Sequence, residues 1–194
     1  MSLDETPMFV PYVRNSHSRT VRDASLPPLG SRPVRQPDSP ENKMAVMHQS
    51  DGPALTGSTF VLSYADTDPA GILYYGAIFP WMERLQSQWF LAHGLRQDRL
   101  RDELGFWLVT CHTECDYLVQ ARLFDRVNSA LRLGRVGRRS FDMDFEFNRD
   151  ADGVVVARAR ITLVTVAPEG NSVDIPAVLH EHLDAWSRGR SLLR

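Results

Sequence analysis

The sequence predicts an α+β fold in which one long helix packs against a single antiparallel sheet. Two observations predict it. The segment 75–93 carries apolar side chains at helical spacing, whereas the segments around it are shorter and rich in β-branched and aromatic residues. Two of the later segments alternate apolar and polar residues, which is typical of antiparallel strands with one face toward a core. The predicted order is therefore one strand, the helix and four further strands.

The composition supports a globular domain and excludes several classes of protein. The chain has 194 residues, of which 43% are hydrophobic and 24% charged, so a hydrophobic core is expected. Its net charge of −2 predicts no binding to nucleic acid or to an anionic membrane. No apolar run approaches the roughly 20 residues that span a bilayer, and the N-terminus does not resemble a secretory signal. The two cysteines fit a reducing cytoplasm, where we expect the protein.

Residues 1–55 differ from the rest of the chain. They are rich in Pro, Ser, Arg and Asp and show neither helical nor strand periodicity, which predicts a disordered tail. Met44 and Met47 lie just before the ordered region, so an incorrectly assigned start codon is an alternative explanation. A third alternative is a docking segment for a partner. The folded domain is expected over residues 56–187.

The first strand and the helix each have a local signal. The run STFVLSYAD, from residue 58, predicts the strand, and the loop DTDPAG follows it. The helix is marked by one apolar face, made by Ile78, Met82, Leu85 and Trp89. Gly94 supplies its C-terminal stop. Pro80 conflicts with a start at residue 75, because proline beyond the first turn removes a backbone hydrogen bond. Either the first turn is irregular or the helix begins later.

The four later strands are predicted over 106–119, 126–136, 140–148 and 154–166. The third of them has one apolar face, with three acids opposite at Asp142, Asp144 and Glu146. A polar, helix-compatible connection is expected over 97–103, and a short terminal helix over 177–187.

The segment CHTEC does not have the spacing of a metal site. On a strand, Cys111 and Cys115 share one face, while His112 and Glu114 lie on the other, which is not how zinc ligands are spaced. Two buried cysteines in a core strand are therefore predicted. The HEH run at 180–182 lacks the HExxH spacing, and we interpret it as part of a polar terminal helix. No metal site is predicted.

The stretch SYADTDPAGILYYGAIFPWMERLQSQWF resembles the opening signature of the 4-hydroxybenzoyl-CoA thioesterase branch of the hotdog-fold superfamily. The pattern is two acids one residue apart, a glycine, an aliphatic pair, an aromatic pair, and a helix with a tryptophan and an acid. Here these residues are Asp66, Asp68, Gly71, Ile72, Leu73, Tyr74, Tyr75, Trp81 and Glu83. The resemblance covers roughly residues 58–180. It implies a hotdog fold, with a long central helix wrapped by a five-stranded antiparallel sheet, and homodimers or homotetramers formed through sheet edges.

The resemblance also implies an activity. Similar proteins hydrolyse an acyl thioester of coenzyme A or of an acyl carrier protein, at a dimer interface and without a metal. Coenzyme A or phosphopantetheine would then be part of the substrate, and no further cofactor is expected. Such proteins occur in catabolic aromatic pathways and beside polyketide synthases, so the acyl group stays open. The aromatic pocket candidates favour a bulky or aryl group.

Within this resemblance Asp68 corresponds to the catalytic carboxylate, and the backbone N–H of Tyr75 to the group that polarises the carbonyl. The residue chemistry agrees, since a carboxylate can act as general base or as nucleophile. Unpaired N–H groups at a helix N-terminus, expected near Tyr75 and Gly76, can form an oxyanion hole. Asp66 is expected to order the loop by local hydrogen bonds. The alternative is that DTDPAG is only a turn that caps the helix.

The sequence gives weaker support to several further candidate site residues. Glu83 could support the site, or it could be a partly exposed acid on the helix. Tyr74 and Trp81 are candidates for substrate binding, with core packing as the alternative for Trp81. Four residues near a predicted turn could bind the phosphates of coenzyme A or phosphopantetheine, or form a solvated hairpin: Arg135, Arg138, Arg139 and Ser140.

Two other functions compete with thioester hydrolysis. The first is a non-catalytic module that binds an acyl or pantetheine group, against which the retained Asp68 argues. The second is a dehydratase of the same fold, whose chemistry usually needs a positioned histidine. None of the six histidines lies in the loop, so the dehydratase ranks last.

Overall fold

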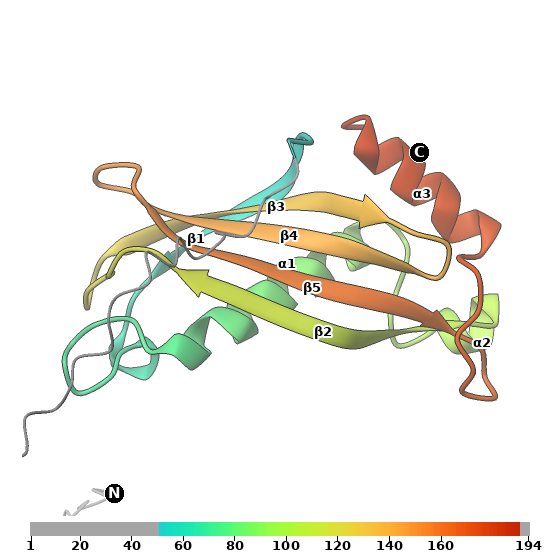
Figure 1. The fold of residues 1–194 in the computed structure, drawn as a ribbon, viewed down its shortest axis with the longest axis horizontal. Helices are drawn as coiled ribbons and strands as arrows, with labels where there is room; N and C mark the ends of the chain where they lie inside the picture. The colour runs from blue at the N-terminus through green and yellow to red at the C-terminus, as the bar shows by residue number, and fades with distance from the viewer. Residues whose placement is uncertain (1–50, 191–194) are drawn as a thin grey trace, which may run out of the picture. The chain divides into compact units, whose positions relative to one another are not determined.

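The computed structural model describes residues 51–190, in which one five-stranded antiparallel sheet covers a long helix (Figure 1). The sheet order is β1-β3-β4-β5-β2, so β1 and β2 are the edge strands. The strands are β1 Ala54–Val61, β2 Trp107–Tyr117, β3 Arg126–Val136, β4 Ser140–Arg149 and β5 Val155–Val166. The helices are α1 Ile78–Ala92, α2 Leu100–Leu104 and α3 Ala177–Ser187. The predicted α+β class and the predicted element order are confirmed.

The first strand begins earlier than the sequence predicts. Its pairing with β3 begins at Ala54, opposite Arg132, and ends at Val61, opposite Arg126. Residues 1–50 of the predicted tail lie outside the described residues. No helix within residues 51–190 is long and apolar enough to cross a bilayer.

The long helix begins at Ile78 rather than at residue 75, which corrects the predicted start. A 3-10 turn over Tyr75–Ala77 precedes it, so the irregular first turn that Pro80 suggested is present. Pro80 is the third residue of α1, where a backbone N–H would have no partner within the helix. The proline is therefore compatible with this start.

The core lies between α1 and the inner face of the sheet. On α1, Ile78 and Met82 are fully buried, and they belong to the same cluster as the apolar face of β4. That face is fully buried too, at Phe141, Met143, Phe145 and Phe147.

The acidic face of β4 is covered by side chains of β5. Asp144 accepts a hydrogen bond of 2.7 Å from Nε of Arg160, and Asp142 accepts one of 2.8 Å from Oγ1 of Thr162. Asp142 and Asp144 are buried as a result. This outer face is a ladder of paired charges rather than a row of solvated acids.

Neither cysteine is fully buried, in contrast to the prediction of two buried cysteines. The register of β2 against β5 shifts between Thr110 and His112, so Cys111 is the extra residue of a bulge and is exposed. Cys115 is half-buried, and burial raises the pKa of its thiol to about 11. The prediction was wrong for Cys111, because a bulge on an edge strand leaves no signal in the alternation of residue types.

The terminal helix α3 is amphipathic rather than polar. Leu179, Leu183 and Trp186 are buried, and the Trp186 ring lies edge-on to Phe90 at a centroid distance of 5.7 Å. The HEH run is only partly solvated, since His182 is half-buried and its ring lies 5.6 Å from that of Trp186. The helix is thereby anchored to the end of α1.

Candidate active site

The loop between β1 and α1 folds back on itself as a short antiparallel hairpin. Thr67 pairs with Leu73, and the N–H of Asp68 donates to the carbonyl of Ile72 at 2.9 Å. Gly71, at the tip, has a φ of 73°, a left-handed conformation that glycine adopts at little cost. The hairpin holds the acid-bearing segment against the chain that enters the helix.

Asp66 orders this hairpin, as the sequence predicts. Its Oδ2 accepts hydrogen bonds from the N–H and the hydroxyl of Ser63, at 2.9 and 2.6 Å. Its carbonyl accepts the N–H of Tyr74 at 2.8 Å. One residue therefore connects the end of β1, the hairpin and the approach to the turn before α1.

Asp68 is held by one of its two carboxylate oxygens. Oδ1 accepts the N–H of Ala70 at 2.8 Å, which is a local turn interaction, whereas Oδ2 accepts no hydrogen bond within the described residues. The side chain is half-buried. A turn interaction therefore accounts for the first oxygen, and the second is available to a substrate or a water molecule.

The turn Tyr75–Ala77 presents backbone donors. The first N–H groups of a helical turn have no partner inside it, and those of Tyr75 and Gly76 make no hydrogen bond outside it within residues 51–190. Asp68 and Tyr75 lie on opposite sides of the Asp66–Tyr74 backbone pair, Asp68 toward the tip of the hairpin and Tyr75 toward α1. The carboxylate and the donors therefore belong to one ordered loop.

Two hollows lie beside this turn. The first has a volume of about 200 Å³, and its lining includes Ile72, Leu73, Tyr75 and Tyr117. The second has a volume of about 370 Å³, and its lining includes Phe60, Tyr74, Gly76, Trp81 and Arg84. Asp68 lines neither, so it lies outside both hollows of the single chain.

Aromatic packing fixes the residues of the second hollow. Trp81 is only 4% exposed and stacks on Phe60 with ring centroids 4.5 Å apart, so core packing accounts for most of its surface. The Tyr74 ring lies against Gly76, where an added Cβ would come within 2.5 Å of it. Gly76 is therefore required for Tyr74 to keep this position.

Glu83 lies apart from the turn. It is exposed on α1, seven residues beyond Gly76, which is roughly 10 Å along a helix. The hydroxyl of Ser87 donates to its Oε1 at 2.8 Å. The hydrogen bonds of the described residues do not connect Glu83 to Asp68.

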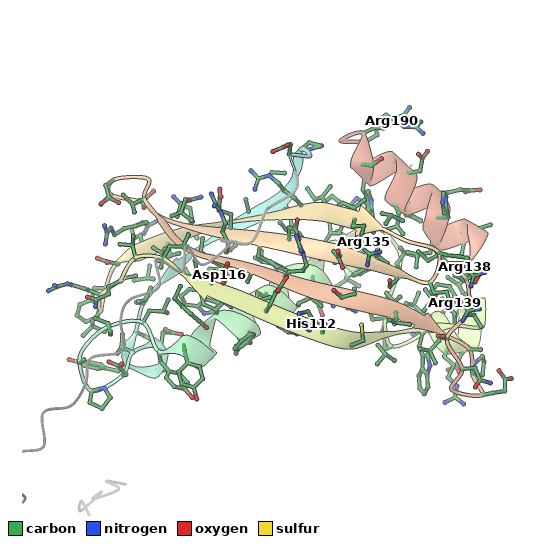
Figure 2. The ribbon with its side chains drawn as sticks, viewed as in Figure 1. His112, Asp116, Arg135, Arg138, Arg139 and Arg190 are labelled. Carbon is green, nitrogen blue, oxygen red and sulfur yellow. The ribbon has the colours of Figure 1, made fainter. Side chains whose placement is uncertain are left out.

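The predicted phosphate-binding residues lie at the other end of the sheet. Arg135 pairs with Asp142 at 3.6 Å, and Arg138 and Arg139 both pair with Asp174. Figure 2 shows all three arginines toward the end of the sheet near α3, and Ser140 begins β4 there. The loop before α1 lies beside the start of β3, and a strand of this length spans roughly 30 Å. One protomer does not bring the arginines to Asp68.

Two residues at the hollows were not predicted. Arg84 lines the second hollow, and the hydroxyl of Tyr117 donates a hydrogen bond to the carbonyl of Tyr75. Burial is the main cause that raises the pKa of Tyr117 above its usual value. Tyr117 and Tyr75 are 42 positions apart, so only the folded chain reveals the contact.

Comparison with known proteins identifies relatives of this chain. The Thioesterase-like superfamily matches residues 62–185. The chain is 26% identical over 141 residues to 1,4-dihydroxy-2-naphthoyl-CoA hydrolase of Prochlorococcus marinus, a match that covers 69% of this chain and 88% of that protein.

Solved structures give the same fold. The 1,4-dihydroxy-2-naphthoyl-CoA thioesterase of Synechocystis is similar with a TM-score of 0.58 at 22% identity, covering 64% of this chain and 91% of that one. A mutant of 4-hydroxybenzoyl-CoA thioesterase in complex with 4-hydroxybenzoyl-CoA has a TM-score of 0.59 at 20% identity, covering 65% and 96%. The predicted hotdog fold is confirmed. Since the family match spans the acid-bearing loop, α1 and the four strands after it, this chain belongs to the Thioesterase-like superfamily.

Proposed function

We propose that this chain hydrolyses acyl thioesters, with Asp68 acting at the carbonyl carbon and the N–H groups of Tyr75 and Gly76 stabilising the oxygen. The single observation that supports it best is that one ordered loop carries both an available carboxylate oxygen and backbone donors that make no hydrogen bond within residues 51–190. A carboxylate can activate water or attack the carbonyl carbon, while backbone donors bind the carbonyl oxygen. Preorganised donors stabilise the charge that develops on the oxygen, and losing one such donor typically costs about 10²–10³ in rate.

The bond changes are simple in this proposal. Asp68 either takes a proton from a water molecule that attacks the carbonyl carbon, or attacks that carbon itself through a carboxylate oxygen. The C–S bond then breaks, and the thiolate leaves and takes up a proton. In the second route water hydrolyses the resulting anhydride. Both routes yield the acid and the free thiol.

Isotope labelling tests the nucleophilic route. In a single turnover in ¹⁸O-water, general-base catalysis places ¹⁸O only in the product acid. Nucleophilic attack by Asp68, followed by water attack on the aspartyl carbonyl, places ¹⁸O in the peptide that contains Asp68. Mass spectrometry that finds ¹⁸O in this peptide would therefore establish nucleophilic attack, since general-base catalysis leaves Asp68 unlabelled.

The substrate class proposed is an acyl-CoA with an aryl or otherwise bulky acyl group. The relative from Prochlorococcus marinus is named for a naphthoyl-CoA substrate. Tyrosine rings border both hollows, at Tyr74, Tyr75 and Tyr117. A polyketide chain on an acyl carrier protein is the alternative substrate.

Since a thiolate is already a good leaving group, we propose that the reaction needs no metal, and EDTA should leave the rate unchanged.

We propose that the active enzyme is a homodimer, or a homotetramer made from such dimers. Within the described residues β2 pairs only with β5, so its outer edge is available. Two β2 strands related by a two-fold axis would run antiparallel. Each end of one sheet would then lie beside the opposite end of the partner's sheet. The partner's arginine-bearing turn would then lie at the same end as Asp68. Sedimentation should give the mass of two or four protomers.

A substrate panel tests this proposal. Thiol release is followed for wild type with 1,4-dihydroxy-2-naphthoyl-CoA, 4-hydroxybenzoyl-CoA, octanoyl-CoA and an acyl carrier protein loaded with the same acyl groups. We expect turnover with the aryl-CoA substrates to exceed that with octanoyl-CoA. Turnover only on the carrier protein would support the alternative substrate. Binding without any turnover would instead support the non-catalytic acyl-binding module.

A further inference from the structure

The phenol of Tyr117 joins an edge strand to the turn before α1. Tyr117 is the last residue of β2, and its hydroxyl donates to the carbonyl of Tyr75, the first residue of the 3-10 turn. Both side chains also line the smaller hollow. The contact therefore lies beside the backbone donors of the proposed site.

Because a peptide unit is rigid, the hydrogen bond to the Tyr75 carbonyl also affects the N–H of the next residue. A trans peptide is planar, so its carbonyl and its N–H point in opposite directions. The carbonyl of Tyr75 and the N–H of Gly76 belong to one such unit. A donor that holds the carbonyl therefore also fixes the direction of the Gly76 N–H, and it restricts rotation about the backbone of Tyr75.

The same contact strengthens the donor. A hydrogen bond to a carbonyl polarises its peptide unit, and hydrogen bonds in a chain reinforce one another. A phenol does this without placing a charge near the thioester. The pKa of Tyr117 is raised, first by burial and next by its hydrogen bond with Cys115, so the hydroxyl keeps its proton at neutral pH.

We propose that Tyr117 is a positioning residue, which sets the direction and the donor strength of the Gly76 N–H toward the thioester carbonyl. This inference rests on the proposed function. Tyr117 acts through the backbone of Tyr75 and Gly76, and it need not touch the reacting atoms.

The Tyr117→Phe variant tests the inference, because it removes only the hydroxyl. We expect kcat with 4-hydroxybenzoyl-CoA to fall about 10–100-fold, below the full effect of a lost oxyanion donor, while KM stays within about threefold. Since a typical hydrogen bond contributes modestly to stability, Tm should fall by no more than about 2–4 °C. The matched control is Tyr64→Phe, which removes an exposed hydroxyl from the same loop region and should match wild type.

A second measurement does not depend on turnover. Amide hydrogen exchange in the peptide spanning 72–78 should be about 5–10-fold faster in Tyr117→Phe, as the loss of about one hydrogen bond predicts. Peptides from β3 and β5 should not change, and Tyr64→Phe should exchange like wild type throughout.

The two measurements together decide the outcome. A lower kcat with faster exchange at the turn supports positioning. A change in KM alone, or a lower kcat without faster exchange, overturns it and assigns Tyr117 a direct contact with substrate. Faster exchange with unchanged kcat also overturns it. If wild type hydrolyses no thioester on the panel, the proposed function fails, and exchange alone then decides whether Tyr117 orders the turn.

Discussion

The backbone N–H of Tyr74 donates to the carbonyl of Asp66 at 2.8 Å, which joins the acid-bearing hairpin to the turn before α1. The side chain of Asp66 meanwhile holds the N–H and the hydroxyl of Ser63. The donors at Tyr75 and Gly76 are therefore positioned by the same residue that closes the loop. The order of this segment and the activity of the site should respond together to changes at Asp66.

Asp66→Ala should lower the free energy of unfolding by about 1–2 kcal/mol, because Ser63 loses its acceptor for two hydrogen bonds. The kcat should fall about tenfold through loosening of the turn. Ser63→Ala is the matched comparison, since it removes only the hydroxyl and should cost less on both counts. Urea unfolding and thiol release measure the two effects. An equal loss in both variants would contradict the role given to the backbone N–H of Ser63.

Gly76→Ala should displace the Tyr74 ring, because the added Cβ would lie 2.5 Å from it. The tip of a tyrosine can move, so stability should change little, whereas kcat/KM should fall about 3–10-fold as the second hollow changes shape. Tyr74→Ala alone should weaken substrate binding. In a double-mutant cycle the two changes should not add, since Gly76→Ala has no ring to displace once Tyr74 is alanine. Additive losses would mean that Gly76 acts independently of Tyr74.

The fold was predictable from periodicity, since the signals of α1 and of the later strands are local. The start of α1 was only partly predictable. Pro80 indicated an irregular first turn, but the 3-10 turn that resolves the conflict depends on contacts with the hairpin and β2.

The candidate site was predictable where its residues are close in sequence. Asp68 and Tyr75 lie on one loop, so the motif names both. Tyr117 could not be found, because its partner is reached only when β2 folds beside the loop. The exposure of Cys111 was missed for a similar reason, since the bulge is set by pairing with β5. Contacts that depend on strand register are not visible in residue patterns.

Trp186→Ala should lower the free energy of unfolding by about 3–5 kcal/mol, because the ring is fully buried and packs on Trp89 and Phe90. Removing it would leave a cavity between α3 and the end of α1. Leu91→Ala, at a residue that is 60% exposed on α1, should change stability by less than about 0.5 kcal/mol. Chemical denaturation measures both. A loss below about 1 kcal/mol for Trp186→Ala would show that α3 contributes little to the fold.

Acidification should destabilise the protein through His182. Burial, followed by the nearby His93, lowers the pKa of His182 below its usual value, while Glu181 acts in the opposite direction. The stability that depends on neutral His182 is therefore fully present above the unfolded-state pKa of about 6.5, and it is lost as pH falls through the lower folded-state pKa.

His182→Phe should flatten this pH dependence between about pH 7.5 and 5, because the ring beside Trp186 is kept and the titrating group is removed. His180→Gln, on the exposed side of α3, is the control and should keep the wild-type slope. The free energy of unfolding as a function of pH provides the measurement. A wild-type slope in His182→Phe would assign the acid sensitivity to another group.

The most direct test of the central claim is the kcat of Asp68→Asn beside that of wild type, on the best substrate of the panel. Asparagine keeps the oxygen that accepts the N–H of Ala70, so the loop should stay folded, while the charge is lost. Asp102→Asn, at an exposed acid on α2, is the matched control and should match wild type. We predict that Asp68→Asn lowers kcat by at least about 10²-fold, as expected for the loss of a general base or nucleophile, with Tm unchanged. A kcat within about threefold of wild type would contradict a catalytic role for Asp68.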